Sequence, residues 1–265
     1  MEEIRKLKVP VISELFARGE KPEYLFWVGC AGAFDDRYKK VVAAFVKILS
    51  FLDISYAVLG KEESCTGDPA RRAGNEMLFQ MQALKNIELF KSYQIRKILT
   101  ICPHCFNIFK NEYPDLGAEI EVENYLQFLG KFIESGKLDL AKTSFADSVI
   151  TYHDPCYLGR ANNIYKTPRF ILKMLSSNLV EMKRNKSFAL CCGAGGGQMF
   201  KEAEKGNKEI FIERTEEALE TNASVVATAC PFCMTMITDG IKYKNREETV
   251  KNYDIAEIIA SSLDL

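Results

Sequence analysis

The stretch at residues 224–233 reads SVVATACPFC, an apolar and β-branched run that ends in two cysteines separated by two residues. Such a run predicts a buried strand of a parallel sheet. The stretch at residues 96–105, RKILTICPHC, has the same form 128 positions earlier. The prolines that follow Cys102 and Cys230 shape the adjoining loops. We therefore expect both cysteine pairs at the carboxyl ends of strands, where open parallel sheets place their functional sites.

The other cysteines repeat in the same way. Cys30 and Cys65 are 35 positions apart, and so are Cys156 and Cys191. The offset between the halves is 126 for these cysteines and 128 for the two CPxC pairs. Equal spacing of so rare a residue predicts an internal repeat.

A further similarity follows at an offset of 128, where VENY at residues 122–125 matches VKNY at residues 250–253. From the repeat we predict three parts of the chain. Residues 1–23 form a lead-in, residues 24–138 a first lobe, and residues 148–265 a second lobe of the same kind, with residues 131–147 as the connecting region.

Within each copy, the hydrophobic pattern alternates between strand-like and helix-like segments. The strand candidates are residues 24–28, 54–59, 96–101, 148–152 and 224–229, and the helix candidates are residues 35–51 and 75–93. This alternation predicts an α/β fold of two tandem, pseudo-symmetric lobes. Each lobe is expected to hold a small, mostly parallel sheet with flanking helices.

The composition excludes several classes of protein. The chain has 265 residues, of which 47% are hydrophobic, so it can form a packed core. Its 35 basic and 36 acidic residues give a net charge of −1, which argues against a nucleic-acid partner. The N-terminal stretch lacks a signal-peptide core, and no apolar run is long enough to span a membrane. We expect a cytoplasmic protein, in which nine cysteines favour metal or redox chemistry over disulfides.

The spacing of the cysteines narrows the chemistry. A CxxC pair alone is compatible with a zinc ribbon, a redox dithiol or an iron–sulfur site. Here the two pairs are 128 positions apart, and each has its own distant single cysteines, so four or five thiolates per copy favour a metal cluster. Adjacent Cys191 and Cys192 suit a cluster with several metal vertices better than one tetrahedral zinc. The glycines at 193 and 195–197 would let backbone N–H groups approach.

The second copy, Cys156-x34-Cys191-Cys192-Gly193-x36-Cys230-x2-Cys233, resembles the CCG cysteine-rich domain family. This family includes heterodisulfide reductase B and the iron–sulfur subunit of glycolate oxidase. The resemblance covers two tandem copies and implies an α/β lobe for each. It also implies that the five cysteines of the complete copy hold a noncubane [4Fe-4S] cluster.

The first copy departs from this pattern. Cys65-Thr66-Gly67 aligns with Cys191-Cys192-Gly193, so Thr66 replaces one cysteine. The four remaining thiolates match a [4Fe-4S] cluster or a four-cysteine zinc site equally well by number. The set consists of Cys30, Cys65, Cys102 and Cys105.

A few other residues flank these cysteines. His153 and His104 are the two histidines of the chain, and each either caps a loop or donates a proton during reduction. His153 is the candidate catalytic residue, because it precedes the complete motif. Arg71 and Arg72 are expected either to bind an anion or to face solvent or a partner. The charged stretch at residues 202–220 is typical of a solvent-facing helix.

These observations predict an iron–sulfur redox subunit of a multi-subunit oxidoreductase, similar to heterodisulfide reductase B. The sequence has no ferredoxin-type cysteine run and no flavin fingerprint, so we expect ferredoxin-like or flavin-containing electron-transfer partners. A complex of this kind can lie at a membrane surface. Reduction of a disulfide at the noncubane cluster is the narrower hypothesis. The competing hypothesis is a zinc-stabilised scaffold or interaction module without redox activity.

Overall fold

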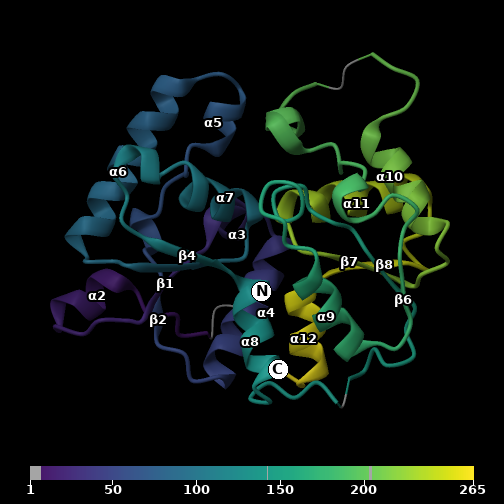
Figure 1. The fold of residues 1–265 in the computed structure, drawn as a ribbon, viewed down its shortest axis with the longest axis horizontal. Helices are drawn as coiled ribbons and strands as arrows, with labels where there is room; N and C mark the ends of the chain where they lie inside the picture. The colour runs from purple at the N-terminus through teal and green to yellow at the C-terminus, as the bar shows by residue number, and fades with distance from the viewer. Residues whose placement is uncertain (1–6, 142, 203–204) are drawn as a thin grey trace. The chain divides into compact units, whose positions relative to one another are not determined.

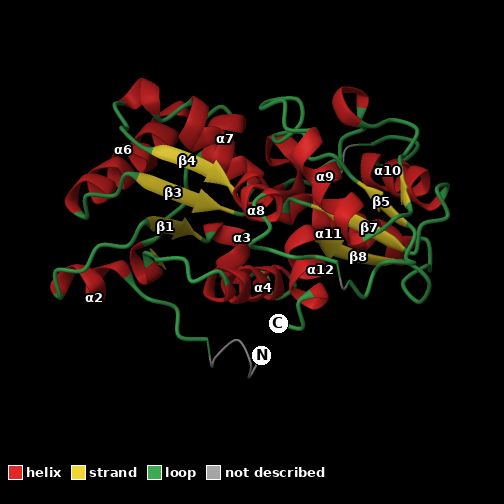
Figure 2. Cartoon of the chain, turned by 60° about the horizontal axis from the view of Figure 1, so that its bottom comes forward, coloured by secondary structure: helices red, strands yellow, loops and turns green. Residues whose placement is uncertain are grey.

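Each half of the chain forms its own four-stranded parallel sheet (Figures 1 and 2). The computed structural model describes residues 7–141, 143–202 and 205–265. The chain divides into two units, Met1–Phe128 and Leu129–Leu265. The α/β prediction with one parallel sheet in each copy is therefore confirmed.

The first sheet has the strand order β2-β1-β3-β4. Its strands are β1 (Tyr24–Trp27), β2 (Tyr56–Ala57), β3 (Lys97–Thr100) and β4 (Glu121–Asn124). Because β1 has β2 on one side and β3 on the other, the chain changes direction along the sheet at the β1/β3 boundary. Such a switch point opens a crevice at the carboxyl ends of the two strands.

Helices cover both faces of this sheet. The helices of this half are α2 (Ile12–Ala17), α3 (Gly29–Phe34), α4 (Tyr38–Phe51), α5 (Asp68–Arg72), α6 (Glu76–Ser92) and α7 (Pro103–Asn111), with short 3-10 turns at Gly60–Glu62 and Pro114–Leu116. Helix α8 (Tyr125–Glu134) begins in the first unit and ends in the second. Successive residues of a strand point to opposite faces. Trp27 meets Phe90 of α6 and Phe109 of α7, whereas Phe26 meets Phe45 of α4. Thus α6 and α7 lie on one face and α4 on the other (Figure 2).

The second sheet repeats this topology with the order β6-β5-β7-β8. Its strands are β5 (Ile150–Tyr152), β6 (Leu179–Val180), β7 (Val225–Thr228) and β8 (Lys251–Asp254). Its helices are α9 (Lys166–Leu175), α10 (Ile210–Leu219), α11 (Pro231–Tyr243) and α12 (Ile255–Ser262), with 3-10 turns at Lys186–Phe188 and Gly195–Phe200. Val226 of β7 packs with Ala218 of α10 and Ile237 of α11 in one apolar cluster. Helices α9 and α12 contact each other.

The structural repeat corrects one detail of the sequence alignment. Ile98 pairs with Val122, and Val226, its counterpart 128 positions later, pairs with Asn252. The last strands therefore match at an offset of 130, and the predicted match of residues 122–125 with 250–253 is wrong by two positions. The side chains that cap the following helices agree with the corrected offset. Asn124 Oδ1 accepts from the Leu126 amide, and Asp254 Oδ1 accepts from the Ala256 amide, both at 3.0 Å.

Three further segments show where the observed helices lie within the predicted parts of the chain. The proposed connector at residues 131–147 begins inside α8, which ends at Glu134. The lead-in contains α2, and Val11 beside it pairs with Val58 next to β2, while residues 1–6 lie outside the described part. The charged stretch at residues 202–220 forms a helix only from Ile210, and residues 203–204 lie outside the described part.

Burial also contradicts the prediction of a purely solvent-facing helix at residues 202–220. Arg214 and Glu217 of α10 are 0% and 5% exposed. Charge spacing along the sequence could not reveal which of these charges face inward. Among the described residues, no helix combines the length and the apolar character needed to cross a bilayer.

Candidate functional site

Four thiols gather at the switch point of the first sheet. We call Cys30, Cys65, Cys102 and Cys105 the first cysteine site. Cys30 lies in α3 directly after β1, and Cys102 is the residue at the N-cap position of α7 after β3. Cys105 follows one turn into α7, and Cys65 lies in the loop after Gly60–Glu62. The sheet topology thus brings three separate segments to one end of β1 and β3.

The thiols of the first cysteine site are close enough for their charges to interact. A hydrogen bond with Cys102 and burial raise the pKa of Cys105 well above its usual value, and the charge of Cys30 adds to this. Burial, with the charges of Cys102 and Cys65, raises the pKa of Cys30 to about 11. Clustered thiols that resist separate ionisation are stabilised as thiolates when they share a cation.

The loop that carries Cys65 is held by two buried polar side chains. The Asn86 amide nitrogen donates to the Cys65 carbonyl and to the Tyr113 hydroxyl, both at 3.0 Å. The Ser64 hydroxyl donates to Asn86 Oδ1 at 2.8 Å, and the Tyr113 hydroxyl donates to the Thr66 carbonyl at 3.0 Å. Asn86 and Tyr113 are 0% exposed, so water does not compete for these bonds.

A carboxylate lies beside the first cysteine site. Glu63 accepts from the backbone amides of Val28 and Gly29, at 3.1 Å and 2.6 Å. Burial raises the pKa of Glu63 to about 7, although these two hydrogen bonds oppose the shift. Gly29 has a φ of +77°, and a Cβ there would lie 3.5 Å from the Cys105 sulfur. The close approach of backbone to thiol thus uses the absence of a side chain.

Carboxylates neutralise the two arginines after Cys65. Arg71 pairs with Glu112 at 2.6 Å, and Arg72 pairs with Glu112 and with Asp68, the latter at 3.0 Å. Asp68 also lies 2.9 Å from His104 Nδ1. Each arginine thus has carboxylate partners within the first unit, and its charge needs no free anion for balance.

Five thiols gather at the equivalent place in the second sheet. We call them the second cysteine site: Cys156, Cys191, Cys192, Cys230 and Cys233. Cys230 is the residue at the N-cap position of α11 after β7, and Cys192 lies 3.3 Å from Cys233, sulfur to sulfur. Cys191 makes hydrogen bonds with both Cys156 and Cys192, and Cys233 with Cys230. The five sulfur atoms therefore form one connected group.

The glycine of the CCG motif shapes both cysteine loops in the same way. Gly193 has a φ of +96°, and its N–H donates to the Cys191 sulfur at 3.3 Å. Gly67 has a φ of +87°, and its N–H donates to the Cys65 sulfur at 3.4 Å. Positive φ suits glycine and turns the N–H back toward the sulfur. Thr66 therefore lies where the second copy has Cys192, in a loop of matching conformation.

Hydrogen bonds among the sulfur atoms shift the thiol pKa values of the second cysteine site in different directions. Hydrogen bonds from Cys156 and Cys192 lower the pKa of Cys191, and the Gly193 N–H acts in the same direction. The bond to Cys191 and burial raise the pKa of Cys156. Bonds to Cys192 and Cys230 and burial raise that of Cys233. The pKa of Cys191 is thus shifted in the opposite direction from those of Cys156 and Cys233.

His153 lies against the second cysteine site. A nitrogen of its ring and the sulfur atoms of Cys192 and Cys233 all lie within 4.8 Å of one another. Its Nδ1 accepts a hydrogen bond from Arg214 Nε at 2.9 Å. Burial and the charge of Arg214 lower the pKa of His153 well below its usual value. Sequence reasoning found His153 but missed Arg214, which lies 61 positions away in a stretch whose charges suggest an exposed helix.

The residues present fit a thiophilic metal group. All nine cysteines are free of disulfides, and all except the exposed Cys30 are buried or half-buried. Thiolate donors select zinc and iron–sulfur clusters over hard cations such as magnesium or calcium. The nine predicted residues are thus brought into two sites, and their assignment as metal ligands remains a prediction.

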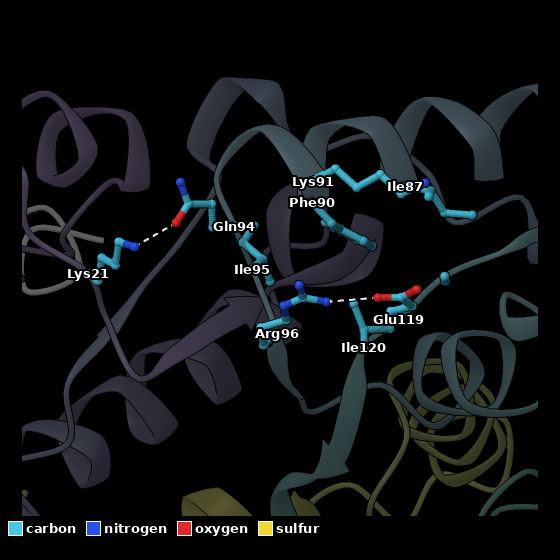
Figure 3. A pocket seen from close by; sticks show the side chains of 10 residues that line it. Lys21, Ile87, Phe90, Lys91, Gln94, Ile95, Arg96, Glu119 and Ile120 are labelled. Carbon is cyan, nitrogen blue, oxygen red and sulfur yellow. Dashed lines mark hydrogen bonds and ion pairs between the residues drawn. The ribbon is translucent and has the colours of Figure 1, made fainter.

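A pocket elsewhere in the first unit is unrelated to this chemistry. It has a volume of about 560 Å³ and lies at the amino ends of β3 and β4 (Figure 3). Arg96, directly before β3, pairs with Glu119 across it at 3.1 Å, and Lys21 donates to Gln94 at 2.6 Å. Since the cysteines follow the opposite, carboxyl ends of the strands, this pocket is separate from the first cysteine site.

Comparison with known proteins gives a family match. The family model of the CCG cysteine-rich domain matches residues 24–110 and again residues 150–238. The chain is 45% identical over 263 residues to the probable iron-sulfur-binding oxidoreductase FadF of Bacillus subtilis, covering 99% of this chain and 37% of that protein. It is 42% identical over 252 residues to the EtfAB:quinone oxidoreductase of Syntrophomonas wolfei, covering 93% of this chain and 35% of that protein.

An archaeal relative is more distant. The chain is 34% identical over 259 residues to a subunit of the dihydromethanophenazine:CoB–CoM heterodisulfide reductase of Methanosarcina barkeri, covering 93% of this chain and 60% of that protein. The chain thus spans little more than a third of the two bacterial relatives and about three fifths of the archaeal one. Each match extends over nearly the whole of the present chain, so both cysteine sites lie within the matched region.

Proposed function

The chain belongs to the CCG cysteine-rich domain family, and from this we propose that it is an iron–sulfur redox module of an oxidoreductase complex. The single observation that carries the proposal is the second cysteine site, where five thiols form one connected group. The names of the bacterial and archaeal relatives support the same class of function. An iron–sulfur cluster bound there would supply reversible one-electron transfer.

We assign the ligands by site. The second cysteine site would hold a noncubane [4Fe-4S] cluster through its five thiolates. The first cysteine site would hold a [4Fe-4S] cluster through four thiolates, with zinc on the same four cysteines as the alternative. Thr66 distinguishes the two sites, because its hydroxyl is a poor substitute for a soft thiolate ligand.

Adjacent cysteines favour iron–sulfur over zinc at the second site. Cys191 and Cys192 both join the sulfur group, through hydrogen bonds with Cys156 and Cys233 respectively. One tetrahedral zinc takes four ligands, which would leave a fifth thiol without a role. The competing function, a zinc-stabilised scaffold, is therefore disfavoured at this site.

The source of the electrons is the next part of the proposal. Neither site brings a flavin-binding or ferredoxin-type sequence, so electrons would enter from a ferredoxin-like or flavin-containing partner or from another part of a longer chain. We propose a cytoplasmic module, in a complex that can lie at a membrane surface. A disulfide is the narrower candidate for the acceptor, in keeping with the name of the archaeal relative.

His153 is the proposed proton donor of the second site. Reduction of a disulfide to two thiols consumes two electrons and two protons. A ring nitrogen of His153 lies within 4.8 Å of two of the cysteine sulfurs, and this proximity supports the proposal.

Anaerobic purification tests the proposal. A brown protein with acid-labile sulfide and an EPR signal on reduction is expected, whereas a colourless, zinc-loaded protein would refute it. Cys192→Ser tests the ligand assignment, because it should remove or convert the second-site cluster and leave the first in place. Unchanged iron content and spectra in this variant would contradict the assignment.

A further inference from the structure

We propose that Arg214 is a positioning residue that fixes the tautomer of His153, so that the ring presents a hydrogen-bond donor to the sulfur atoms of the second cysteine site. This inference rests on the proposed function and deepens it. It names the residue that controls what His153 offers to a bound cluster or its substrate.

Every nitrogen of a charged arginine is a donor, and none is an acceptor. Arg214 Nε donates to His153 Nδ1 at 2.9 Å, so Nδ1 must carry a lone pair. In the neutral ring the proton is then on Nε2. The N–H of His153 is therefore at Nε2, on a ring of which one nitrogen lies within 4.8 Å of the Cys192 and Cys233 sulfur atoms.

Arg214 is itself held in place from two sides. Its Nη1 donates to the Arg184 carbonyl at 2.8 Å and to Glu217 Oε2 at 3.0 Å. Glu217 is also paired with Arg184 Nε at 3.1 Å. The guanidinium thus has little freedom to turn away from the imidazole, and α10 carries both members of the Arg214–Glu217 pair.

The burial of Arg214 is costly for a purely structural residue. Its side chain is 0% exposed, and its Nη2 has no hydrogen-bond partner among the described residues. Burying a charged group with an unpaired N–H lowers stability. This cost is explained if the guanidinium orients His153 beside the second cysteine site.

In the first copy, no histidine occupies the position that corresponds to His153. Trp27, three residues before Cys30, takes the place that His153 has three residues before Cys156. The other histidine, His104, meets the opposite kind of partner, since the Asp68 carboxylate lies 2.9 Å from its Nδ1. A carboxylate accepts, so it places the proton of His104 on Nδ1. The two histidines of the chain are therefore held in opposite tautomers.

The consequence for a bound cluster is a change in its potential. N–H donors near cluster sulfur favour the reduced, more negative state. Without Arg214, the His153 ring is free to turn its lone pair toward sulfur, and the donor is lost. We expect Arg214→Met to lower the midpoint potential of the second-site cluster, so that the ratio of reduced to oxidised cluster at a fixed potential falls roughly three- to tenfold.

EPR-monitored redox titration of the full chain tests this, with matched variants. Arg214→Lys keeps one donor and should recover part of the potential. Arg160→Met removes another charge that acts on His153 but keeps the bond from Arg214 to His153, and should stay near wild type. His153→Gln supplies an amide donor that needs no tautomer, so Arg214→Met should add no further shift in that background. An equal shift in both backgrounds would overturn the proposal, because it would show a plain charge effect.

A second measurement applies even if Arg214→Met does not fold. In the wild-type chain loaded with zinc and labelled with 15N-histidine, NMR should show Nε2–H for His153 and Nδ1–H for His104, with His104→Gln used for assignment. An Nδ1–H tautomer of His153 would refute the inference. A natively purified chain that is colourless and zinc-loaded but still shows the Nε2–H tautomer would refute the proposed redox function and leave the positioning role standing.

Discussion

Replacing Asn86 by leucine should loosen the loop that carries Cys65. Leucine fills nearly the same space but makes no hydrogen bonds. The change removes the bonds of Asn86 to the Cys65 carbonyl, the Tyr113 hydroxyl and the Ser64 hydroxyl, at 3.0, 3.0 and 2.8 Å. At about 1 kcal/mol for each bond, the loop loses ~3 kcal/mol of stabilisation.

This loss of loop stabilisation should increase the rate of metal release from the first cysteine site. If release from the first cysteine site requires the Cys65 loop to open, ~3 kcal/mol raises the open population by roughly two orders of magnitude. The assay is the rate of iron transfer from the anaerobic protein to a chelator. The Asn86→Leu variant should show a fast phase for the first-site metal, while the second-site metal leaves at the wild-type rate.

Ser176→Ala provides the matched control. Ser176 is 3% exposed, and its hydroxyl bonds to the Ser148 carbonyl at 2.7 Å and to the Asn178 amide at 3.0 Å, before β5 and β6 begin. The control removes bonds of comparable energy at the end of the second sheet away from the cysteines. Equal acceleration in both variants would refute the reasoning, because general destabilisation would then explain the release. A wild-type rate in Asn86→Leu would refute it as well.

Three other changes test the two cysteine sites. Thr66→Cys places a fifth thiol in a loop that already has the conformation of the second copy, so we expect a first-site cluster with altered EPR spectra. Noncubane spectra of the first site in the native protein would show that Thr66 is not a lost ligand. Gly193→Ala should destabilise the second unit by ~1–2 kcal/mol, because an L-residue resists a φ of +96°, whereas Gly195→Ala, which has open space and no positive φ, should change chemical denaturation far less. Glu63 binds a proton more tightly in the folded state, since burial raises its pKa to about 7. The metal-free protein should therefore lose stability as pH rises from about 4.5 to 7, and Glu63→Gln should flatten that slope in urea titrations; an unchanged slope would contradict the burial of this carboxyl.

The repeat and the cysteine chemistry could be predicted from the sequence because both depend on spacing along the chain. A CPxC pair after an apolar run predicts a strand followed by a functional loop, and the structure places Cys102 and Cys230 at the N-cap positions of the helices that follow β3 and β7. The replacement of a cysteine by Thr66 can also be recognised from an alignment of the two copies alone. These features are local, or are copied from one half to the other.

Long-range contacts and burial could not be read in the same way. Asn86, at mid-helix, gives no sequence signal that it binds a loop 21 positions earlier. Likewise, a charged stretch predicts exposure, yet one turn of α10 directs Arg214 inward to His153. The alignment of β4 with β8 also differs by two positions from the match between their sequences, because the pairing of these strands with β3 and β7 sets the alignment.

The sequence by itself determined that this chain has two related α/β lobes and two unequal sets of thiols, because the number and spacing of the cysteines can be read directly from it. Only the tertiary structure decided which polar groups support those thiols. The protonation of His153, the support of Cys65 and the neutralisation of Arg71 and Arg72 each depend on a side chain from another element. Such contacts are set by how helices pack on the sheet, and the one-dimensional pattern does not contain that information.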